Sequence, residues 1–203
     1  DSPLDDEYLG ENVYLNMING AKRYVYITTP YLIVDSEMKT ALCLAAKRGV
    51  DVQIITPGIP DKKIVWDLTR SYYPELLSAG VHLYEYAPGF IHSKLCICDD
   101  EAAVTGTINF DYRSLYLHFE NACLFIYNAV VLQAKMTFCV RRKNPRRSSL
   151  KIWGISKSIE VCSAVSITQS CGYLHRFCKK KSLGTLKQKM SIFICEAIFS
   201  STD

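Results

Sequence analysis

Apolar positions along the first part of the chain alternate between helical spacing and short β-branched runs. From residue 11 to residue 23, the apolar side chains lie close to one helical stripe, formed by Val13, Leu15, Met17, Ile18 and Ala21. The run that follows, 24–28, is aromatic and β-branched. Residues three and four apart share one face of a helix, and a short apolar run is typical of a buried strand. The pattern therefore predicts a helix over 11–23 and a strand over 24–28.

A second helix and strand follow with the same spacing. Apolar residues at helical intervals predict a helix over 35–48, with Asp35 or Ser36 as its N-terminal cap and Gly49 as its stop. Residues 50–56 are apolar and β-branched, and they predict a buried strand.

A third unit completes the alternation. Asp61 can cap the next helix, which Pro74 interrupts and Gly80 ends, and a strand is predicted over 81–86. Alternation of this kind makes a mixed β-sheet with helices against both faces, so the predicted fold class is α/β. In such folds, functional groups gather at strand ends and in loops.

The stretch FIHSKLCICDDEAAVTGTIN concentrates the polar groups that can do chemistry. Residues 92–98 alternate and are rich in β-formers, which predicts a strand with His92 and Lys94 on one face. Cys96 and Cys98 fall in the same register. We therefore expect all four side chains to point one way, with the two thiols packed along that face.

A turn and a return strand follow this segment. An Asp-Asp pair starting at Asp99 interrupts the apolar run as a turn, and 102–105 predicts the return strand. Gly106 permits a sharp bend before Thr107 and Asn109, which form a second pair two residues apart.

An imidazole beside an ammonium, with a hydroxyl and a carboxamide nearby, suits a tetrahedral anion such as a phosphodiester. Lys94 offers a positive charge, Thr107 and Asn109 offer neutral donors, and His92 can attack phosphorus or protonate a leaving oxygen. This chemistry needs no metal, and we predict no cofactor. The alternative for His92 is a core histidine without a function, but the spacing of the four groups favours the phosphodiester site.

The pattern His-x-Lys-x4-Asp followed by Gly-Thr-x-Asn resembles the HKD signature of the phospholipase D superfamily. Longer strings resemble the C-terminal half of bacterial cardiolipin synthases, among them ENVYLNMINGAKRYVYITTPYLI, AAKRGVDVQIITPGIPDKK, LTRSYYPELLSAGVHLYEYAPGFIHSK and GTINFDYRSLYLHFE. The likeness covers roughly residues 1–133. It implies a phospholipase D-like mixed β-sheet flanked by helices, which is one half of the usual two-motif enzyme.

The resemblance implies a role for each matching residue. His92 is one of two catalytic histidines, and Lys94 and Asn109 hold phosphate oxygens. Thr107 stands where the family has Ser or Thr. Glu120 matches an acidic residue that, in this superfamily, hydrogen-bonds the far ring nitrogen of the histidine and stabilises the imidazolium.

Other positions leave alternatives open. Asp99 is the motif aspartate, and as a carboxylate at a strand end it is either catalytic or structural. Arg113 either meets phosphate or pairs with Asp111 or a carbonyl. Gly58 departs from the family, which often has His before Ile-Pro-Asp, and we expect this to alter a rim contact and not the chemistry.

The family needs two HKD motifs, with one histidine attacking and the other acting as acid, and this chain carries one. The implied reaction transfers a phosphatidyl group between two phosphatidylglycerol molecules through a phosphohistidine, giving cardiolipin and glycerol. By family order, His92 is the general acid/base partner. The expected partners are phosphatidylglycerol, a membrane surface, and either the missing N-terminal HKD half or a second copy of this chain. We expect the chain alone to be weakly active or inactive.

Charge changes sharply along the chain. Residues 1–133 hold 10 Lys and Arg against 17 Asp and Glu, a balance of −7, whereas 134–203 hold 14 against 3, a balance of +11. Five of the nine Cys also lie in the second segment, without the CxxC spacing of zinc sites or a disulfide framework. One interpretation is a solvated basic tail, and another is an arm for anionic lipid or nucleic acid.

A third interpretation is a shifted reading frame. Residues 134–140 are encoded by GCN AAR ATG ACN TTY TGY GTN, and reading two nucleotides later allows EDDFLR or KDDFLR. That string is similar to the helix that cardiolipin synthases carry after the strand predicted over 121–127. Residues 149–153 in the same frame allow a string similar to the family's TLEDL. We therefore expect residues 134–203 to be poorly folded and the sheet to lack a covering helix.

The remaining expectations concern origin and rival functions. The chain begins with an acidic, turn-forming segment and has no apolar run of about 20 residues, so we expect a fragment. The parent is expected in the bacterial cytoplasmic membrane, and the fragment is expected to be soluble or peripheral in the cytoplasm. A phospholipase D-like phosphodiesterase or nuclease would use the same residues. A non-enzymatic binder of anionic lipid or nucleic acid would use the basic tail, although we expect no nucleic-acid partner.

Overall fold

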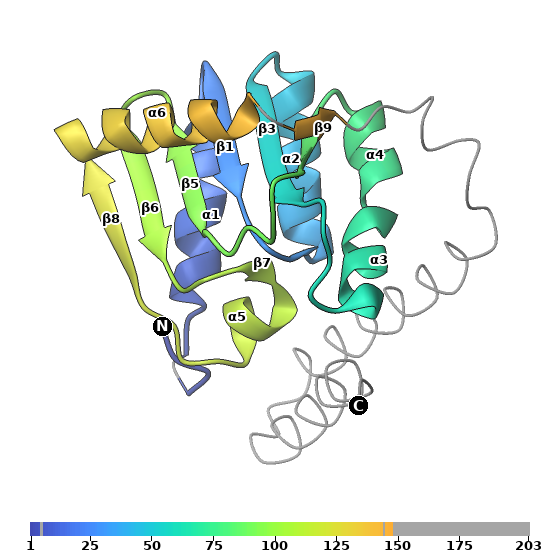
Figure 1. The fold of residues 1–203 in the computed structure, drawn as a ribbon. Coiled ribbons are helices and arrows are strands. Elements are labelled where there is room, and N and C mark those ends of the chain that lie inside the picture. Colours follow the sequence, from blue (N-terminus) through green and yellow to red (C-terminus); the bar gives the residue numbers. More distant parts are fainter. Residues whose placement is uncertain (5, 144, 148–203) are drawn as a thin grey trace.

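The structure is a computed structural model that describes residues 1–4, 6–143 and 145–147 (Figure 1). The helices are α1 (Leu9–Gly20), α2 (Ser36–Lys47), α3 (Lys63–Ser71), α4 (Tyr73–Ser78), α5 (Tyr112–Tyr116) and α6 (Ala129–Arg142). The strands are β1 (Tyr24–Thr28), β2 (Leu32–Ile33), β3 (Asp51–Pro57), β4 (His82–Tyr86), β5 (Leu95–Cys98), β6 (Ala102–Gly106), β7 (Phe110–Asp111), β8 (Ala122–Ile126) and β9 (Pro145–Arg147). Among these residues, no helix is both long and apolar enough to span a bilayer.

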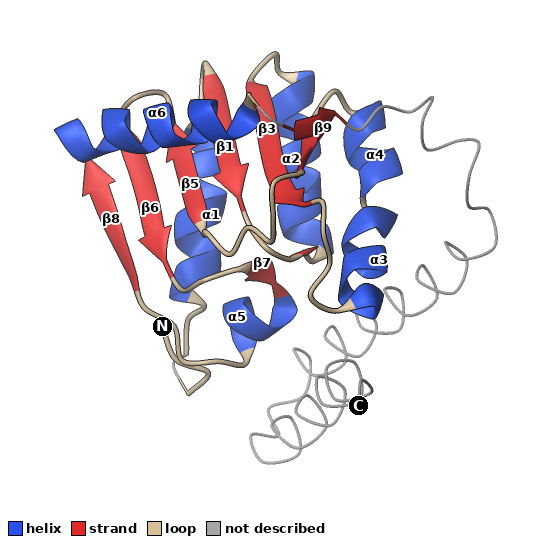
Figure 2. Ribbon diagram, in the orientation of Figure 1, coloured by secondary structure: helices blue, strands red, loops and turns tan. Residues whose placement is uncertain are grey.

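Seven strands form one mixed sheet in the order β8-β6-β5-β1-β3-β4-β9 (Figure 2). Strands β1, β3 and β4 are parallel, as their intervening helices require, and β5, β6 and β8 are antiparallel to their neighbours. Strands β2 and β7 form a separate two-stranded parallel sheet. The predicted α/β class with a mixed sheet is confirmed.

Helix ends follow partly from the capping residues that the sequence predicts. Asp35 caps α2 by accepting a hydrogen bond from the Met38 N–H at 2.8 Å, and Gly49 follows the helix at a φ of 91°. Asp61 is not a helix cap, because α3 begins after Lys62. The Asp61 carboxylate accepts hydrogen bonds from the Tyr31 hydroxyl and the Lys62 N–H instead.

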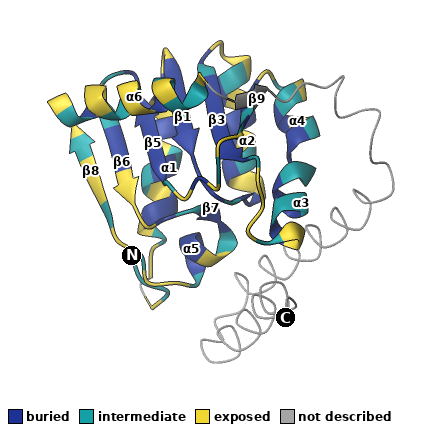
Figure 3. Cartoon of the chain, in the orientation of Figure 1, coloured by how far each residue is buried: buried dark blue, intermediate teal, exposed yellow. Residues whose placement is uncertain are grey.

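Apolar residues cover both faces of the sheet. On one face, α1, α2, α3 and α4 pack against residues of β1 and β3 such as Ile27 and Ile54, both fully buried. On the other face, α6 packs against Ile97 and Ala103 through Val131 and Phe138. Figure 3 shows the resulting contrast between the buried central strands and the exposed residues of β8 and α6.

Helix α6 crosses residue 133, where the charge balance changes. Phe138 has no exposed surface and stacks on Tyr26 with ring centroids 4.8 Å apart, and Arg142 donates to the Gln53 side chain at 2.8 Å. The expectation that the sheet lacks a covering helix is therefore wrong for residues 134–142. The tail from residue 148 onward lies outside the described residues, and the shifted reading frame stays a prediction.

The strand that carries the HKD-like pattern is shorter than predicted. Strand β5 begins at Leu95, so His92 and Lys94 lie in the irregular segment before it. Strand alternation then does not fix their direction, and the expectation that they share one face with Cys96 and Cys98 is wrong for His92. Its side chain is exposed, whereas the other three are buried.

Candidate functional site

Two loops meet at one end of the antiparallel pair β5 and β6. Leu95 at the start of β5 pairs with Thr105 near the end of β6. Lys94 therefore lies close to the residues that follow β6, and the Thr105 hydroxyl donates to the Lys94 carbonyl at 3.1 Å. The pairing of β5 with β6 places His92 and Lys94 at the same end of these strands as Thr107 and Asn109.

Two hydrogen bonds, one to α1 and one to the segment after β1, hold the loop after β6 in place. The Tyr14 hydroxyl donates to the Ile108 carbonyl at 3.0 Å, and the Phe110 N–H donates to the Thr29 hydroxyl at 3.2 Å. Both bonds are buried, so they hold the backbone on either side of Asn109.

Lys94 is a nearly buried cation with hydrogen-bonding capacity to spare. Its side chain is 8% exposed, and its ammonium donates to the His92 carbonyl at 2.8 Å. Burial lowers the pKa of Lys94, while the carboxyl groups of Glu120 and Asp111 oppose that change. An ammonium carries three donors, so two remain for an anion in the arrangement of the described residues.

His92 lies at the exposed rim beside this cation. Its ring is 5.8 Å from the ring of Phe90, measured between centroids. Partial burial and the positive charge of Lys94 lower the pKa of His92, and Asp61 partly opposes them. The lowered pKa favours the neutral imidazole, which can accept a proton.

Glu120 does not orient His92 in this structure. One Glu120 carboxylate oxygen accepts a hydrogen bond from the Thr107 hydroxyl, and the other lies 3.5 Å from Nδ1 of His118. Among the described residues, no hydrogen bond joins Glu120 to His92. The resemblance implies that Glu120 hydrogen-bonds the ring of His92, but in this structure Glu120 accepts from Thr107 instead.

Thr107 is also engaged within the protein. Its hydroxyl donates to Glu120 and accepts from the Asn121 N–H at 2.9 Å. In this arrangement its proton is not offered to a ligand, so Thr107 ties the start of β8 to the loop after β6.

Asn109 and Asp111 lie together behind the site. The side chain of Asn109 acts on the Asp111 carboxyl and lowers its pKa, and the Asn109 Oδ1 atom is buried without a partner in the described residues. Asp111 is 2% exposed and accepts from the Ser114 N–H at 2.8 Å. The positive charge of the exposed Arg113 opposes the rise in the pKa of Asp111 that burial causes.

Asp99 lies at the opposite end of β5 and is structural. Its carboxylate accepts backbone N–H bonds from Lys22, Arg23 and Tyr24 at 2.7, 2.9 and 2.8 Å. Burial alone would raise the pKa of Asp99, but these three bonds together hold it below its usual range. The motif aspartate thus joins the hairpin to the start of β1 and does not reach the site.

Sequence reasoning missed Asp111 as a member of the site. The signal was available, because Asp111 followed three residues later by Ser114 fits a helix N-cap placed directly after the Asn109 motif. What could not be read from the pattern is that the side chain of Asn109 also acts on this carboxyl.

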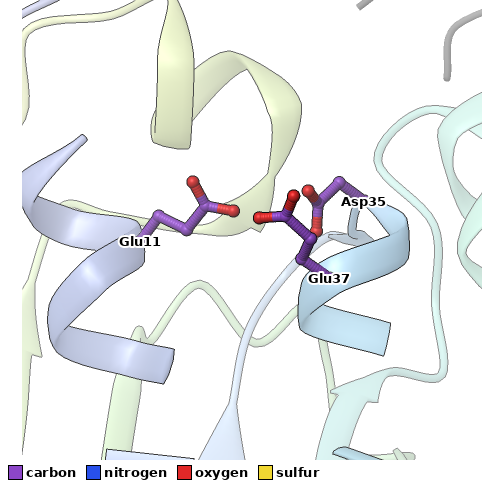
Figure 4. A group of neighbouring side chains, drawn as sticks. All are labelled: Glu11, Asp35 and Glu37. Atoms are coloured by element: carbon purple, nitrogen blue, oxygen red, sulfur yellow. The ribbon is translucent and has the colours of Figure 1, made fainter. Parts of the chain in front are cut away.

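One group of carboxylates has the spacing of a metal site. Glu11, Asp35 and Glu37 present oxygens within 4.8 Å of one another, from α1 and the start of α2 (Figure 4). Two of them already have protein partners, since Glu11 accepts from the Tyr116 hydroxyl at 2.5 Å and Asp35 caps α2. This group is therefore explained by packing between α1, α2 and α5.

Comparison with known proteins identifies the family of this chain. A family model described as "Cardiolipin synthase, PLD-like domain" matches residues 14–139, which include every predicted site residue. The chain belongs to the phospholipase D-like domain family. The match also extends past residue 133 into the second half of α6.

Several bacterial proteins match this chain at high identity, but the match covers only part of their own length. A cardiolipin synthase of Halalkalibacterium halodurans is 49% identical over 118 residues, covering 58% of this chain and 24% of that protein. One from Geobacillus is 51% identical over 116 residues, covering 57% and 23%. An uncharacterised Streptococcus mutans protein is 56% identical over 147 residues, covering 72% and 32%. The chain thus spans less than a third of these relatives.

Solved structures share the fold at low identity. The phospholipase D family member Nuc from Salmonella typhimurium matches with a TM-score of 0.59 and 23% identity, covering 68% of this chain and 90% of that one. NucT from Helicobacter pylori matches with a TM-score of 0.56 and 21% identity, covering 71% and 95%. These two comparisons identify the fold of the phospholipase D-like domain.

Proposed function

We propose that this phospholipase D-like domain is one half of the active site of a phosphatidyltransferase of the cardiolipin synthase type. The observation that carries the proposal is Lys94, a nearly buried ammonium with two spare donors, which lies beside an accessible imidazole and at the same end of the β5 and β6 pair as Asn109. About 50% identity to cardiolipin synthases favours a phospholipid as the phosphodiester.

The proposed reaction has two displacements at one phosphorus. A histidine of the other half attacks the phosphorus of phosphatidylglycerol, and the bond from phosphorus to the headgroup glycerol oxygen breaks. His92, in its protonated form, gives its proton to that oxygen, and glycerol leaves. The neutral His92 then takes the proton from a headgroup hydroxyl of a second phosphatidylglycerol, whose oxygen displaces the first histidine. Cardiolipin forms, and both histidines return to their starting states.

The other groups hold the phosphate through these steps. Lys94 offsets negative charge on the phosphoryl oxygens, and Asn109 supplies a neutral donor. Arg113 is exposed beside Asp111 and adds positive charge at the rim of the site. Asp99 and Glu120 take no chemical step and hold the framework.

A complete site needs a second histidine. It comes from an upstream HKD half of the parent protein or from a second copy of this chain. The parent acts at the bacterial cytoplasmic membrane, since its proposed substrate is a membrane lipid, and the chain itself contacts that surface peripherally. The basic segment needs no nucleic-acid partner in this proposal.

The test compares the parent protein with this chain, using phosphatidylglycerol vesicles and measuring cardiolipin and glycerol. We expect the parent to form both products and its His92→Gln variant to be about 10²- to 10⁴-fold slower, as for loss of an acid/base group. The chain alone should form little or none. Release of phosphatidic acid without cardiolipin, or faster turnover of a generic phosphodiester, would favour a hydrolase or nuclease instead.

A further inference from the structure

Helix α6 carries exposed apolar side chains on the side that faces away from the sheet. Val131 and Phe138 pack on the sheet and are fully buried. Leu132, Met136 and Val140 are instead 50%, 62% and 64% exposed, and Figure 3 shows exposed residues along this helix. Residues four apart share one side of a helix, so these three form an outer stripe about 12 Å long.

Positive charge gathers at the C-terminal end of the same helix. The helix and Lys143, which follows it, hold four Lys and Arg and no Asp or Glu. Lys135 pairs with Asp100 at 2.7 Å. Among the described residues, no ion pair joins Arg141, Arg142 or Lys143 to a carboxylate. Three positive charges therefore remain beside the outer stripe.

An apolar stripe flanked by cations is typical of a helix that lies in the surface of an anionic bilayer. There, apolar side chains enter the boundary between headgroups and acyl chains, and Lys and Arg meet lipid phosphates. A nucleic acid would also attract the cations, but its phosphates would leave the outer stripe in water. The acidic balance of −7 over residues 1–133 opposes approach by the rest of the domain, which favours α6 as the contacting side.

A second α-helix fits the outer stripe less well than a lipid surface. Helices that pack along a shared seam alternate spacings of three and four residues. From Leu132 and Met136, such a seam would continue through Cys139 and Lys143. It would place a charged side chain in the contact and leave Val140 outside it.

We propose that the outer stripe of α6 and the three cations at its C-terminal end form a docking surface for an anionic phospholipid bilayer. The apolar side chains enter the interfacial region, and the cations lie against lipid phosphates. This surface goes beyond the proposed function, because it needs neither His92 nor a phosphodiester in the site.

The first experiment reads the position of α6 directly, using the full chain with ¹³C-labelled methionine methyl groups. Met136 belongs to the outer stripe, whereas Met17 and Met38 are buried against the opposite face of the sheet. A nitroxide-labelled lipid in bicelles that contain phosphatidylglycerol should broaden the Met136 resonance, which is assigned by its loss in Met136→Ala. The resonances of Met17 and Met38 should stay sharp. Bicelles of phosphatidylcholine alone should broaden none of these three.

The second experiment measures the partition of the full chain into phosphatidylglycerol vesicles by sedimentation. Leu132→Gln combined with Met136→Gln should lower binding by about tenfold or more, because their apolar area is no longer buried in the interface. Arg141→Gln combined with Lys143→Gln should lower binding by about fivefold for each charge removed, and by less at high salt.

Matched controls come from α2, on the opposite face of the sheet. Leu44 is 49% exposed and Lys47 is also exposed, so Leu44→Gln and Lys47→Gln remove the same kinds of group elsewhere. Both should bind vesicles as the wild type does. Circular dichroism should show that every variant keeps its fold, since the exchanged side chains are exposed or half-buried.

Several outcomes would overturn this docking surface. No binding to phosphatidylglycerol vesicles, or equal binding to phosphatidylcholine, contradicts an anionic lipid partner. A sharp Met136 resonance in the bound chain, or α6 variants that bind normally, places the contact elsewhere. Self-association without lipid that Met136→Gln abolishes would make the stripe a protein interface, and preferential binding to duplex DNA would assign the cations to nucleic acid. None of these results depends on cardiolipin formation, so the proposed function is tested separately.

Discussion

At the residue scale, the role of Asp99 in the HKD-like motif, structural or catalytic, can be tested by substitution. Asp99→Asn leaves the left-handed backbone in place, because Asn tolerates the φ of 55° found here, but an amide cannot accept all three N–H bonds. We expect a loss of about 1–3 kcal/mol in the free energy of unfolding, measured by urea titration. Phosphodiester binding should be unchanged.

The pH dependence of this effect has a definite sign. The pKa of Asp99 is lowered in the folded state, so its stabilisation is present above the unfolded-state value of about 3.9 and is lost as the pH falls through the folded value. The difference between wild type and Asp99→Asn should therefore shrink below about pH 4. Asp67→Asn, on α3, is the control and should change stability little. Loss of phosphodiester binding without loss of stability would instead make Asp99 a ligand-contacting group.

A second residue-scale prediction concerns His92. Partial burial and the ammonium of Lys94 lower its pKa, so removing the ammonium should raise it. We expect the His92 ring protons of Lys94→Met, followed by NMR against pH, to titrate at a higher pH than in the wild type. Lys47→Met, at an exposed position of α2, should leave the midpoint in place. An unchanged midpoint in Lys94→Met would mean that the two side chains are not neighbours.

At the element scale, helix α6 decides where the folded unit ends. Phe138 has no exposed surface, whereas Met136, on the same helix, is 62% exposed. Phe138→Ala should destabilise the chain by about 3–5 kcal/mol, because it removes a buried aromatic ring from the contact with Tyr26. Thermal or urea unfolding measures the difference.

The matched variant on α6 is Met136→Ala, which should change stability by less than about 0.5 kcal/mol. Equal, small effects of the two substitutions would show that residues 134–142 do not pack on the sheet and would restore the boundary at residue 133. The DNA of the parent gene tests the shifted frame separately, since a base lost or gained near codon 134 would be visible there.

At the scale of the whole molecule, one chain provides one His92. Any cardiolipin formed by the chain alone should depend on two copies sharing a site, so the initial rate should rise more steeply than linearly with protein concentration. At a protein concentration high enough to saturate pairing, a threefold excess of the His92→Gln chain should lower the rate per wild-type chain to about a quarter, because three quarters of the wild-type chains then have a partner without His92. The assay is cardiolipin formation in phosphatidylglycerol vesicles.

The control for this mixing experiment is an equal excess of Asp67→Asn chain, which keeps His92 and should not lower the rate. A rate that is linear in concentration and insensitive to the His92→Gln chain would mean that a single copy is sufficient. That result would remove the need for a second half.

The sequence by itself determined the α/β alternation, the limits of most strands, a cap of α2 at Asp35 or Ser36, and the placement of Lys94 and Asn109 at the same end of β5 and β6. These features depend on local spacing: periodicity sets which face is buried, and a short hairpin brings its own ends together. Tertiary structure alone decided that Asp99 serves β1, that Glu120 binds Thr107, that Asn109 acts on Asp111 and that α6 continues past residue 133. Each of these depends on which distant group fills the space beside a side chain, and the hydrophobic pattern of one segment does not contain that information.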